Sequence, residues 1–342
     1  MTAPGLVLAR EIVNHQVIVI DEATQAPWVI APYGLSTGST PPYDAAGCDN
    51  LVVIVTRVTA LVYDIIWGSY TTIPVSATRI AMDTVGKIAW LDVHQHAIAP
   101  LDLNTMTLGS GTFPSGVYSG VYAITDIAVT PDGGTVLVAC TDAATELLGK
   151  VIAYDVATST WASPIDISAT IGYPSAITVT SDGVSAYVTG GIFHSSPPPG
   201  LPGGVVQIDI ASNSIASVPA TGFDYPYCVA VTPDDSTLFF GTWPYPDLTA
   251  HYLTPITLPS SVGSTFSLPS GYALDNVVGS SDGSTLWVAG VGPTATPHPV
   301  LIPYDLTTLT FGTPVIVSYG SGGCTARVMP TPPLPQGIVM VV

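Results

Sequence analysis

One nine-residue pattern recurs four times along the chain and limits the folds that the sequence can adopt. Its copies are Thr130–Val138, Thr180–Val188, Thr232–Phe240 and Ser280–Val288. Each copy begins with Thr or Ser, carries Asp at its third position and ends in an apolar run, and the four aspartates are 50, 52 and 48 residues apart. A regular spacing in this range is typical of proteins that are built from repeated structural units.

The pattern itself predicts a β-hairpin. An apolar run such as Ile127–Val129 precedes the turn residues Pro131–Gly133, and a second apolar run follows them. Pro presets φ early in a turn, Asp accepts hydrogen bonds from the backbone ahead of it, and Gly tolerates positive φ. Each unit also holds a strand that ends in an Asp-led tight turn, as in Val151–Thr158. Four antiparallel strands in about 50 residues form one blade of a β-propeller.

Both elements predict seven blades. The Asp-led turn occurs at six aspartates, with a degenerate seventh copy near Thr254–Ile256; the aspartates are Asp21, Asp64, Asp102, Asp155, Asp209 and Asp305. The hairpin has four clear copies, and weaker ones lie near Gly47–Asn50, Met82–Lys87 and Pro330–Gln336. Six and eight blades are the alternatives to this count.

The two ends of the chain are predicted to share one blade. Val17–Thr24 resembles the outer half of a blade, and Gly337–Val342 resembles the second strand of an inner hairpin. Joining residues 1–28 to 318–342 would remove open sheet edges. The other blades then span residues 29–73, 74–114, 115–169, 170–220, 221–269 and 270–317, and the first of them carries an insertion at Gly34–Ala46. We therefore predict a single all-β propeller domain over residues 1–342, with four antiparallel strands in each blade.

Charge and hydropathy disfavour several classes of partner. The net charge is −18, with only six Lys and Arg residues, so the surface is expected to repel nucleic acid and anionic membranes. No stretch has the 18 or so uncharged apolar residues of a membrane span. Met1–Gly5 does not resemble a secretory signal. Cys48, Cys140, Cys228 and Cys324 are far apart in sequence, and we expect buried free thiols.

The longer loops of the predicted propeller lie on one face and are rich in aromatic residues and proline. Because Tyr and Trp supply contact area at a low cost in conformational entropy, such loops are typical of a recognition surface. The alternative is that the aromatic rings fill gaps between blades. The candidate binding residues are Tyr173, Phe193, Tyr225, Tyr227, Trp243, Tyr245 and Tyr272.

A second candidate site is the mouth of the central channel. Alignment of the hairpins places Arg79, Asp126 and Asn276 at equivalent positions of different blades, together with Ala176, Cys228 and Ala326. Arg79 and Asp126 would then form an ion pair between neighbouring blades. This polar mouth could bind a small ligand, but a pair that locks two blades together is the favoured interpretation, because buried charge needs a partner.

Catalytic and metal-binding motifs are weak. Asp92, His94 and His96 form the best metal-like cluster, since alternate residues of a strand share a face. Residues 92–96 are more typical of an exposed connection between strands, and no third ligand is evident. We therefore predict no metal and no cofactor. The sequence contains no Gly-x-Ser-x-Gly elbow, phosphate-binding loop or dinucleotide fingerprint.

The hairpin at Val129–Val138 and its copies, followed by Tyr154–Thr158, resemble the YVTN-type or surface-layer-type seven-bladed propellers. The resemblance is clear in residues 115–317 and implies the blade without implying an activity, because this fold hosts both enzymes and binding proteins. Enzyme relatives include lactonase-like propellers, whose sites gather acidic, Arg and His groups over the channel.

We therefore expect a non-enzymatic structural or adhesion propeller that recognises a protein or a glycan. The Pro-, Thr-, Ser- and Tyr-rich, Lys-poor composition without an export signal is similar to that of tail or fibre proteins of tailed bacteriophages. The expected location is the virion, after synthesis in the host cytoplasm, and the expected partners are other virion proteins or a host-surface protein or glycan. A cell-surface or extracellular location is the alternative, and a lactonase- or hydrolase-type enzyme with a site at the channel is the alternative function.

Overall fold

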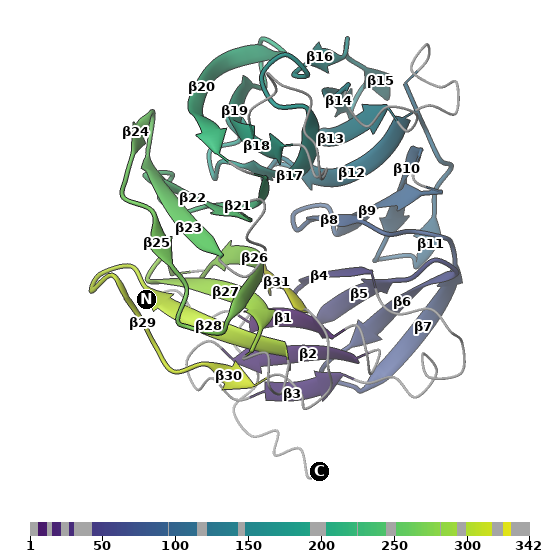
Figure 1. The fold of residues 1–342 in the computed structure, drawn as a ribbon. Coiled ribbons are helices and arrows are strands. Elements are labelled where there is room, and N and C mark those ends of the chain that lie inside the picture. The colour runs from purple at the N-terminus through teal and green to yellow at the C-terminus, as the bar shows by residue number, and fades with distance from the viewer. Residues whose placement is uncertain are drawn as a thin grey trace.

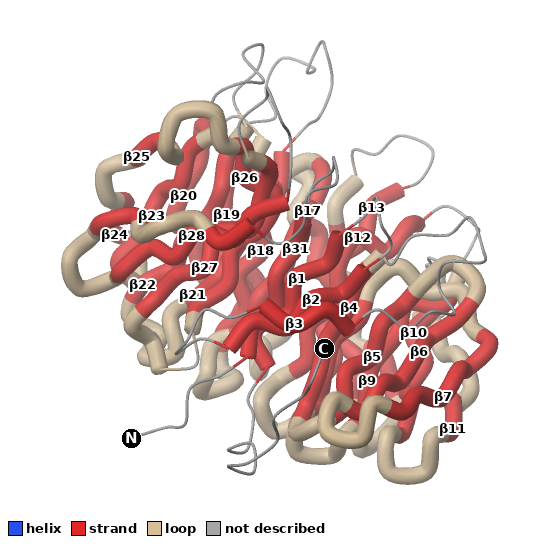
Figure 2. The backbone as a smooth tube through the Cα atoms, turned by 90° about the horizontal axis from the view of Figure 1, so that it is seen from below, coloured by secondary structure: helices blue, strands red, loops and turns tan. Residues whose placement is uncertain are grey.

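The chain folds into β-sheets that are arranged radially around a central axis (Figure 1). This computed structural model describes residues 6–11, 16–21, 27–30, 43–94, 96–114, 122–142, 148–191, 203–223, 225–243, 251–280, 282–292, 299–316 and 324–329, with side chains given for most residues between Tyr43 and Ile316. In the side view, these residues form strands and their connections (Figure 2). No helix within the described ranges is long and apolar enough to cross a membrane.

Six blades follow one another along the chain, each formed from consecutive antiparallel strands. Blade 1 holds β4 (Asp44–Cys48), β5 (Leu51–Val55), β6 (Thr59–Asp64) and β7 (Ser69–Pro74). Blade 2 holds β8 (Ile80–Asp83), β9 (Ile88–Val93), β10 (Ala97–Asp102) and β11 (Thr107–Leu108). Blade 3 holds β12 (Tyr122–Val129), β13 (Thr135–Asp142), β14 (Lys150–Asp155), β15 (Thr160–Trp161) and β16 (Ile165–Asp166).

The remaining three blades repeat this arrangement. Blade 4 holds β17 (Tyr173–Val179), β18 (Ser185–Gly191), β19 (Gly203–Asp209) and β20 (Ser214–Phe223). Blade 5 holds β21 (Pro226–Val231), β22 (Thr237–Thr242), β23 (Tyr252–Thr257), β24 (Ser261–Val262) and β25 (Phe266–Ser267). Blade 6 holds β26 (Ala273–Gly279), β27 (Thr285–Val291), β28 (Pro299–Asp305), β29 (Thr310–Phe311) and β30 (Val315–Ile316).

The predicted count of seven blades is wrong, and the strand pairing shows why. The seventh blade was to take a complete inner hairpin from residues 318–342, but the turn at Pro330–Gln336 and the strand at Gly337–Val342 lie outside the described residues. Instead, β31 (Cys324–Met329) pairs directly with β1 (Leu6–Glu11). Only the backbone pairing of this terminal sheet is described, so we assign the fold as an all-β propeller with six four-stranded blades.

The terminal sheet also divides the strands between the two chain ends differently from the prediction. Its order is β3-β2-β1-β31, with β2 at Gln16–Asp21 and β3 at Pro27–Ile30. Among the described residues, the N-terminal segment supplies three strands of this sheet and the C-terminal segment supplies one, whereas the sequence predicted two from each. In blade 1, β4 begins at Asp44, inside the segment that was predicted as an insertion through Ala46. A turn-like composition shows where a chain reverses, but it does not show which strands pair.

Each Asp–Gly turn is stabilised by the same pair of hydrogen bonds. Thr130 Oγ1 donates to Asp132 Oδ1 at 2.6 Å, and the same carboxylate oxygen accepts from Gly134 N at 2.9 Å. The turns at Asp182, Asp234 and Asp282 repeat the hydroxyl contact at 2.6 Å. The sequence interpretation of these aspartates as turn residues is confirmed.

One of these turns departs from the pattern and links two blades. Residues Gly133, Gly183 and Gly283 have φ of 71°, 71° and 73°, but the equivalent residue of blade 5 is Asp235 with φ of 55°. Its carboxylate accepts from Ser181 N at 2.8 Å and from Ser181 Oγ at 2.7 Å, in the neighbouring turn of blade 4. A residue that is unfavourable for its own backbone conformation thus connects the turns of two blades.

Proline interrupts the outer strands of three blades. Trp90, Phe239 and Trp287 on the second strands pair with Pro100, Pro255 and Pro303 on the third strands. A glycine at the end of the short outer strand lies opposite each proline. Its N–H donates to the carbonyl oxygen of the proline, at 2.7 Å for Gly109, 2.8 Å for Gly263 and 2.7 Å for Gly312. A β-carbon at Gly109, Gly263 or Gly312 would lie 2.8–2.9 Å from the proline Cγ. Short, broken outer strands leave little edge for another chain to pair with.

The hydrophobic core lies between the blades. One cluster joins blades 1 and 2 through residues such as Val53 and Leu91, and another joins blades 3 and 4 through Leu137 and Val188. Three further clusters join blades 5 and 6, blades 2 and 3, and blades 4 and 5. Each interior blade therefore buries both of its faces, which explains the low charge content and the near-continuous apolar runs of the strands.

We expect Leu309→Gly to stabilise the protein by about 0.5–1 kcal/mol. Leu309 occupies the last position of an Asp-led outer turn with φ of 57°, and 65% of its side chain is exposed. Removing the side chain relieves the left-handed strain and loses little buried area. Urea denaturation measures the effect; the control Asn213→Gly, at the equivalent turn with φ of 49°, should change stability less because Asn tolerates this conformation. Destabilisation by Leu309→Gly would contradict the prediction.

We expect the protein to lose stability in acid through its Asp–Gly turns. The Thr or Ser hydroxyl, and then a backbone N–H, hold the pKa of Asp132, Asp182, Asp234 and Asp282 below the usual range. A lowered folded-state pKa contributes stability above the unfolded pKa, and this contribution is lost as pH falls through the folded value. The free energy of unfolding should therefore fall below about pH 4. Thr232→Val removes the hydroxyl that donates to Asp234, so the free energy of unfolding of this variant should decrease less between about pH 4 and lower pH. Urea denaturation at several pH values measures the effect. The same pH dependence in the variant and the wild type would show that this hydroxyl does not lower the pKa of Asp234.

Candidate functional site

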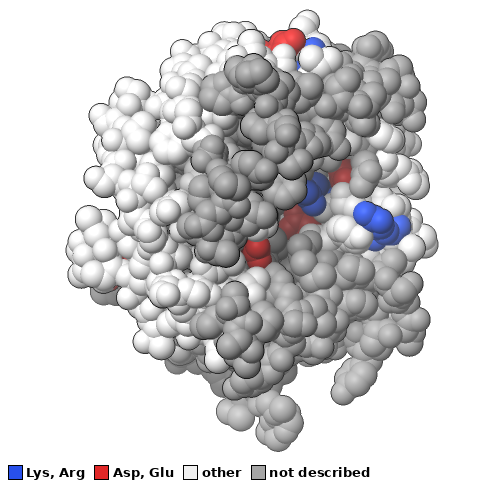
Figure 3. Space-filling model, in the orientation of Figure 1, with Lys and Arg blue, Asp and Glu red and all other residues white. Residues whose placement is uncertain are grey.

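The first strands of all six blades enclose a central cavity of about 540 Å³. Its charged lining residues are Asp44, Arg79, Asp126 and Asp275. On the face of the molecule seen in Figure 3, acidic and basic side chains meet in the hollow at the centre. This mouth lies at the ends of the first strands that are remote from the Asp–Gly turns. We call this side of the molecule the loop face and the opposite side the turn face.

A β-bulge near the mouth recurs in four consecutive blades. The register shifts in blades 3 to 6, and the extra residues are Thr125, Ser175, Tyr227 and Asp275. Ser175, Tyr227 and Asp275 line the cavity, whereas Thr125 Oγ1 donates to the carbonyl oxygen of Ala139. Bulges redirect side chains, so this repeated irregularity places three different functional groups from neighbouring blades around one opening.

Aspartates on the first strands connect neighbouring blades, and one of them, Asp126, directly follows the bulge of blade 3. Asp126 accepts from Ile127 N with Oδ1 and from Ile177 N, in blade 4, with Oδ2, both at 3.0 Å. Asp44 does the same in blade 1, where it accepts from Ala45 N at 2.9 Å and from Ile80 N of blade 2 at 3.3 Å. These buried carboxylates therefore join the inner strand of one blade to that of the next.

Arg79 crosses between blades through backbone groups. Its Nε donates to the carbonyl oxygen of Thr125 in blade 3 at 2.6 Å, and its Nη1 donates to the carbonyl oxygen of Thr78 at 3.0 Å. The sequence predicted an ion pair between Arg79 and Asp126, whereas the described contact of Arg79 with blade 3 is made to the backbone carbonyl of Thr125. Asp92, fully buried, accepts from Arg79 N and from Thr78 Oγ1, each at 2.7 Å. Burial raises the pKa of Asp92, and these donors act in the opposite direction.

Four aromatic side chains gather on the loop face of blade 5. Tyr225 stacks on Tyr227 with ring centroids 6.1 Å apart, Trp243 lies 5.9 Å from Tyr227, and His251 lies 5.2 Å from Trp243. Tyr227 Oη donates to the carbonyl oxygen of Leu274. Burial raises the pKa of Tyr227 well above its usual value and lowers the pKa of His251, so both groups are uncharged at neutral pH. We call these four residues the aromatic cluster.

The predicted binding residues have three different outcomes. The structure brings Tyr225, Tyr227 and Trp243 together. Tyr272 packs against the core between blades 5 and 6, as the gap-filling alternative expected, and Tyr227 packs against the same core. Tyr173 is half-buried at the start of β17. The last two candidates, Phe193 and Tyr245, lie outside the described residues.

Of the predicted channel-mouth residues, Arg79, Asp126 and Asn276 all line the cavity. Asn276 Oδ1 accepts from Val277 N at 2.8 Å, as the aspartates do in their own blades. Sequence reasoning missed Asp44, because its strand was assigned to an insertion. It also missed Ser175, Asp275 and His251. A bulge residue has no signature of its own, although its place directly before an aligned polar residue could have indicated Asp275.

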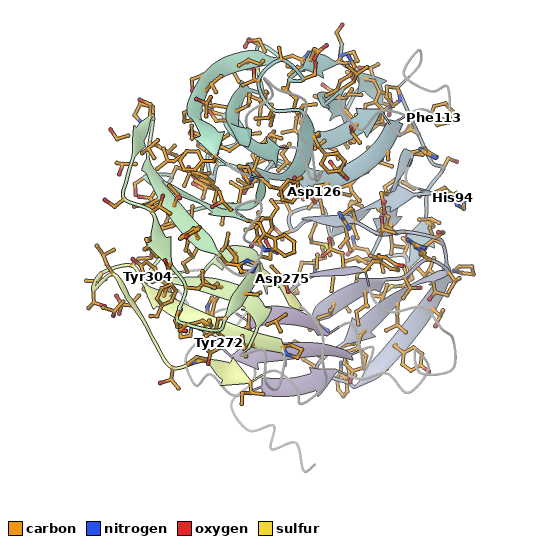
Figure 4. The ribbon with its side chains drawn as sticks, in the orientation of Figure 1. His94, Phe113, Asp126, Tyr272, Asp275 and Tyr304 are labelled. Carbon is orange, nitrogen blue, oxygen red and sulfur yellow. The ribbon has the colours of Figure 1, made fainter. Side chains whose placement is uncertain are left out.

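His94 and His96 do not form a metal centre with Asp92. They lie in the turn between β9 and β10, where His94 has φ of 55° and is exposed. His94 lies near the rim of the ring, whereas Asp126 and Asp275 lie at its centre (Figure 4). No group of three potential ligands that could hold a metal ion occurs among the residues that the structure describes. The interpretation of this segment as a connection between strands is confirmed.

Three cysteines are buried free thiols, as predicted. They are Cys48, Cys140 and Cys228; the side chain of Cys324 lies outside the described part of the chain. Burial raises the pKa of Cys48 to about 11 and that of Cys140 to about 12, so both are protonated and unreactive at neutral pH.

Comparison with known proteins identifies the fold alone. No family model and no curated protein matches the sequence. Among solved structures, a chain of the mitotic checkpoint complex matches with a TM-score of 0.64 and 12% identity over 82% of each chain. Dihydro-heme d1 dehydrogenase NirN in complex with DHE matches with a TM-score of 0.58 and 13% identity, over 93% of this chain and 74% of NirN.

A third similar structure is the β-propeller domain of Cps50 (Swd1) from Myceliophteria thermophila. Its TM-score is 0.61 at 11% identity, over 81% of this chain and 88% of that domain. Similarity at this level of identity shows a shared β-propeller fold, and the resemblance to the YVTN-type family stays a prediction.

We expect Asp126→Ala to destabilise the protein by about 2–4 kcal/mol, because two buried N–H groups in two blades lose their acceptor. Asp126→Asn keeps one acceptor oxygen and should cost about half as much. The matched control is Asp155→Ala, which removes an exposed carboxylate that accepts from Thr158 N, and it should cost less than about 1 kcal/mol. Equal losses for the two alanine variants in urea denaturation would show that Asp126 does not hold the blades together.

Proposed function

We propose that this propeller is a non-enzymatic recognition module whose binding surface is the loop face around the aromatic cluster. The observation that carries the proposal is the association of Tyr225, Tyr227 and Trp243 beside the mouth of the cavity. Tyr227 lines that cavity, and Tyr225 and Trp243 are half-buried. Aromatic residues held in this way are typical binding hot spots.

The polar groups of the mouth support a binding role over a catalytic one. Asp44 and Asp126 use both carboxylate oxygens to accept backbone N–H groups. Arg79 donates to two carbonyl oxygens. Groups that are committed to holding blades are poor candidates for moving protons during a reaction. His251 is 5% exposed and lies within the aromatic cluster.

The packing of the rings favours a protein partner over a glycan. Sugar stacking needs one ring face that is open and flat. Here the rings of Tyr225 and Tyr227 stack with an angle of 15° between their planes, and the ring of Trp243 makes tilted contacts with Tyr227 and His251. Ring edges are therefore more available than ring faces, which suits contact with protein side chains.

We further propose that the protein works within a larger assembly, as a tail or fibre component of a virion. The acidic, Lys-poor composition supports this proposal, because it suits a surface component that does not bind nucleic acid. The stacked blades support it as well, since they give a rigid platform for loops. Display on a cell surface is the alternative location.

The test is binding of the purified protein to particles from its native source, measured by cosedimentation. We expect Trp243→Ala to weaken binding at least tenfold, as for a hot-spot residue. The matched control is Trp67→Ala: Trp67 is 80% exposed in the β6–β7 turn, on the turn face, and its removal should leave binding unchanged. Equal affinity of the two variants, or the absence of any particle-bound protein, would overturn the proposal; loss of binding after periodate oxidation of the particles would identify a glycan partner.

A further inference from the structure

The outer strand of blade 1 differs from the outer strands of the other five blades. β7 pairs with β6 at six consecutive residues, from Ser69 to Pro74, without a register shift. The outer strands of blades 2, 3, 5 and 6 have two residues each. Blade 4 has the long outer strand β20, but its pairing with β19 shifts register three times. Short strands and bulges protect a sheet edge from pairing with another chain, so among these six blades β7 is the long and regular edge.

This edge lies at the surface and carries no charge. The side chains from Ser69 to Thr72 are exposed, and that of Tyr70 is 50% exposed. Both views of the backbone place β7 at the outer rim of the ring (Figure 1 and Figure 2). The sequence has no Asp, Glu, Lys or Arg from residue 65 to residue 78. Charged side chains are a common protection of exposed edges, and β7 lacks them.

The hydrogen bonds of blade 1 show which backbone groups of β7 point outward. Thr56 N donates to Thr59 O at 2.8 Å, so the backbone groups of Thr59 face β5. Because this direction alternates along an antiparallel strand, the groups of every second residue after Thr59 also face β5. The partners of these residues on β7 are Tyr70, Thr72 and Pro74, so their backbone groups point away from β6. Pro74 has no N–H, which suits this outward position.

The two outward residues that carry an N–H allow β7 to pair with a second copy of itself. In an antiparallel arrangement, Tyr70 of each copy lies opposite Thr72 of the other, and the twofold axis passes beside Thr71. Each of these two pairs exchanges two N–H···O=C hydrogen bonds, and the two Thr71 residues form a non-hydrogen-bonded pair, in which side chains are closest. The pairs span residues 69–73, and Trp67 lies outside them in the preceding turn.

The net charge of the protein favours an uncharged contact between copies. Each copy carries a net charge of −18, so two copies repel one another wherever their acidic side chains would meet. The β7 edge brings no carboxylate of its own into the contact. The remaining repulsion acts over a longer range between exposed groups, and salt screens it.

We propose that two copies of this protein associate through β7 and thereby join their blade 1 sheets into one continuous antiparallel sheet. The contact involves one strand from each copy, so it belongs to the small and weak class of interfaces, and the expected Kd is about 10 μM. β7 belongs to blade 1 and the aromatic cluster to blade 5, so this proposal does not depend on the proposed function.

The first experiment is sedimentation equilibrium of the full chain at concentrations from about 2 to about 200 μM, which span the expected Kd. We expect a monomer–dimer equilibrium. The dimer should be more stable in about 0.5 M than in about 0.05 M NaCl, because salt screens the repulsion between the two acidic copies. A protein that stays monomeric at about 200 μM in both salt concentrations (about twenty times the expected Kd) would overturn the proposal.

Charge substitutions at Thr71 then test the twofold axis. Thr71→Lys and Thr71→Glu each place two like charges opposite one another, so each variant alone should dimerise at least about fivefold more weakly. An equimolar mixture of the two variants should recover dimers, because opposite charges then meet. The matched control is Val218→Lys on β20, where the side chain is 39% exposed, and it should leave the Kd unchanged. A mixture that stays monomeric, or equal weakening by Val218→Lys, would show that the copies do not meet at Thr71.

A proline substitution tests the backbone hydrogen bonds. Thr72→Pro removes an N–H that points outward and keeps every bond of β7 to β6, so it should abolish the dimer while thermal unfolding shows a folded protein. Trp243→Ala, which tests the partner surface, should leave the dimer Kd within about twofold, since Trp243 is not part of blade 1. An unchanged dimer Kd in Thr72→Pro would contradict pairing through β7.

Discussion

The packing of each blade against its two neighbours is the constraint on which the rest of this structure depends. A single four-stranded sheet with two apolar faces cannot exist alone in water, since it must cover both faces. Here the buried hydrophobic clusters lie between blades. Buried polar side chains that reach a neighbouring blade form hydrogen bonds with its backbone. The carboxylate of Asp126 shows the rule, because it accepts an N–H from its own strand and another from the next blade.

Residues at the outer edge of the blades and at the central axis lie outside these packed faces, so this constraint does not fix them. At the outer edge, Pro100, Pro255 and Pro303 lie in third strands whose outer neighbours are short or divided. Blade 3 has the same divided outer edge with Ala153 in place of the proline. Near the axis, the first strands end next to a cavity, and a bulge there changes the direction of one side chain without disturbing the packed faces. Ser175, Tyr227 and Asp275 all lie at such bulges.

The sequence predicted those features of the fold that are encoded locally. The Asp–Gly turns, the Asp-led outer turns and the strands beside them lie where the repeat placed them, because turn chemistry acts within a few residues. The blade count failed because it depended on the pairing of distant strands, and within the described part of the chain β31 pairs with β1. The site was predicted incompletely: alignment found Arg79, Asp126 and Asn276, but Asp275 and Ser175 depend on a register shift that composition does not reveal.

The ring of equivalent residues on the first strands explains why one repeated blade produces an asymmetric cavity. In blades 1 to 3 these residues are Asp44, Arg79 and Asp126, and each donates or accepts hydrogen bonds that reach the following blade. In blades 4 and 5 they are Ala176 and Cys228, which offer no charged group for such a link. The charged contacts that reach the following blade therefore lie on the side of blades 1 to 3, whereas blade 5 contacts blade 6 through Tyr227 Oη, which donates to the carbonyl oxygen of Leu274.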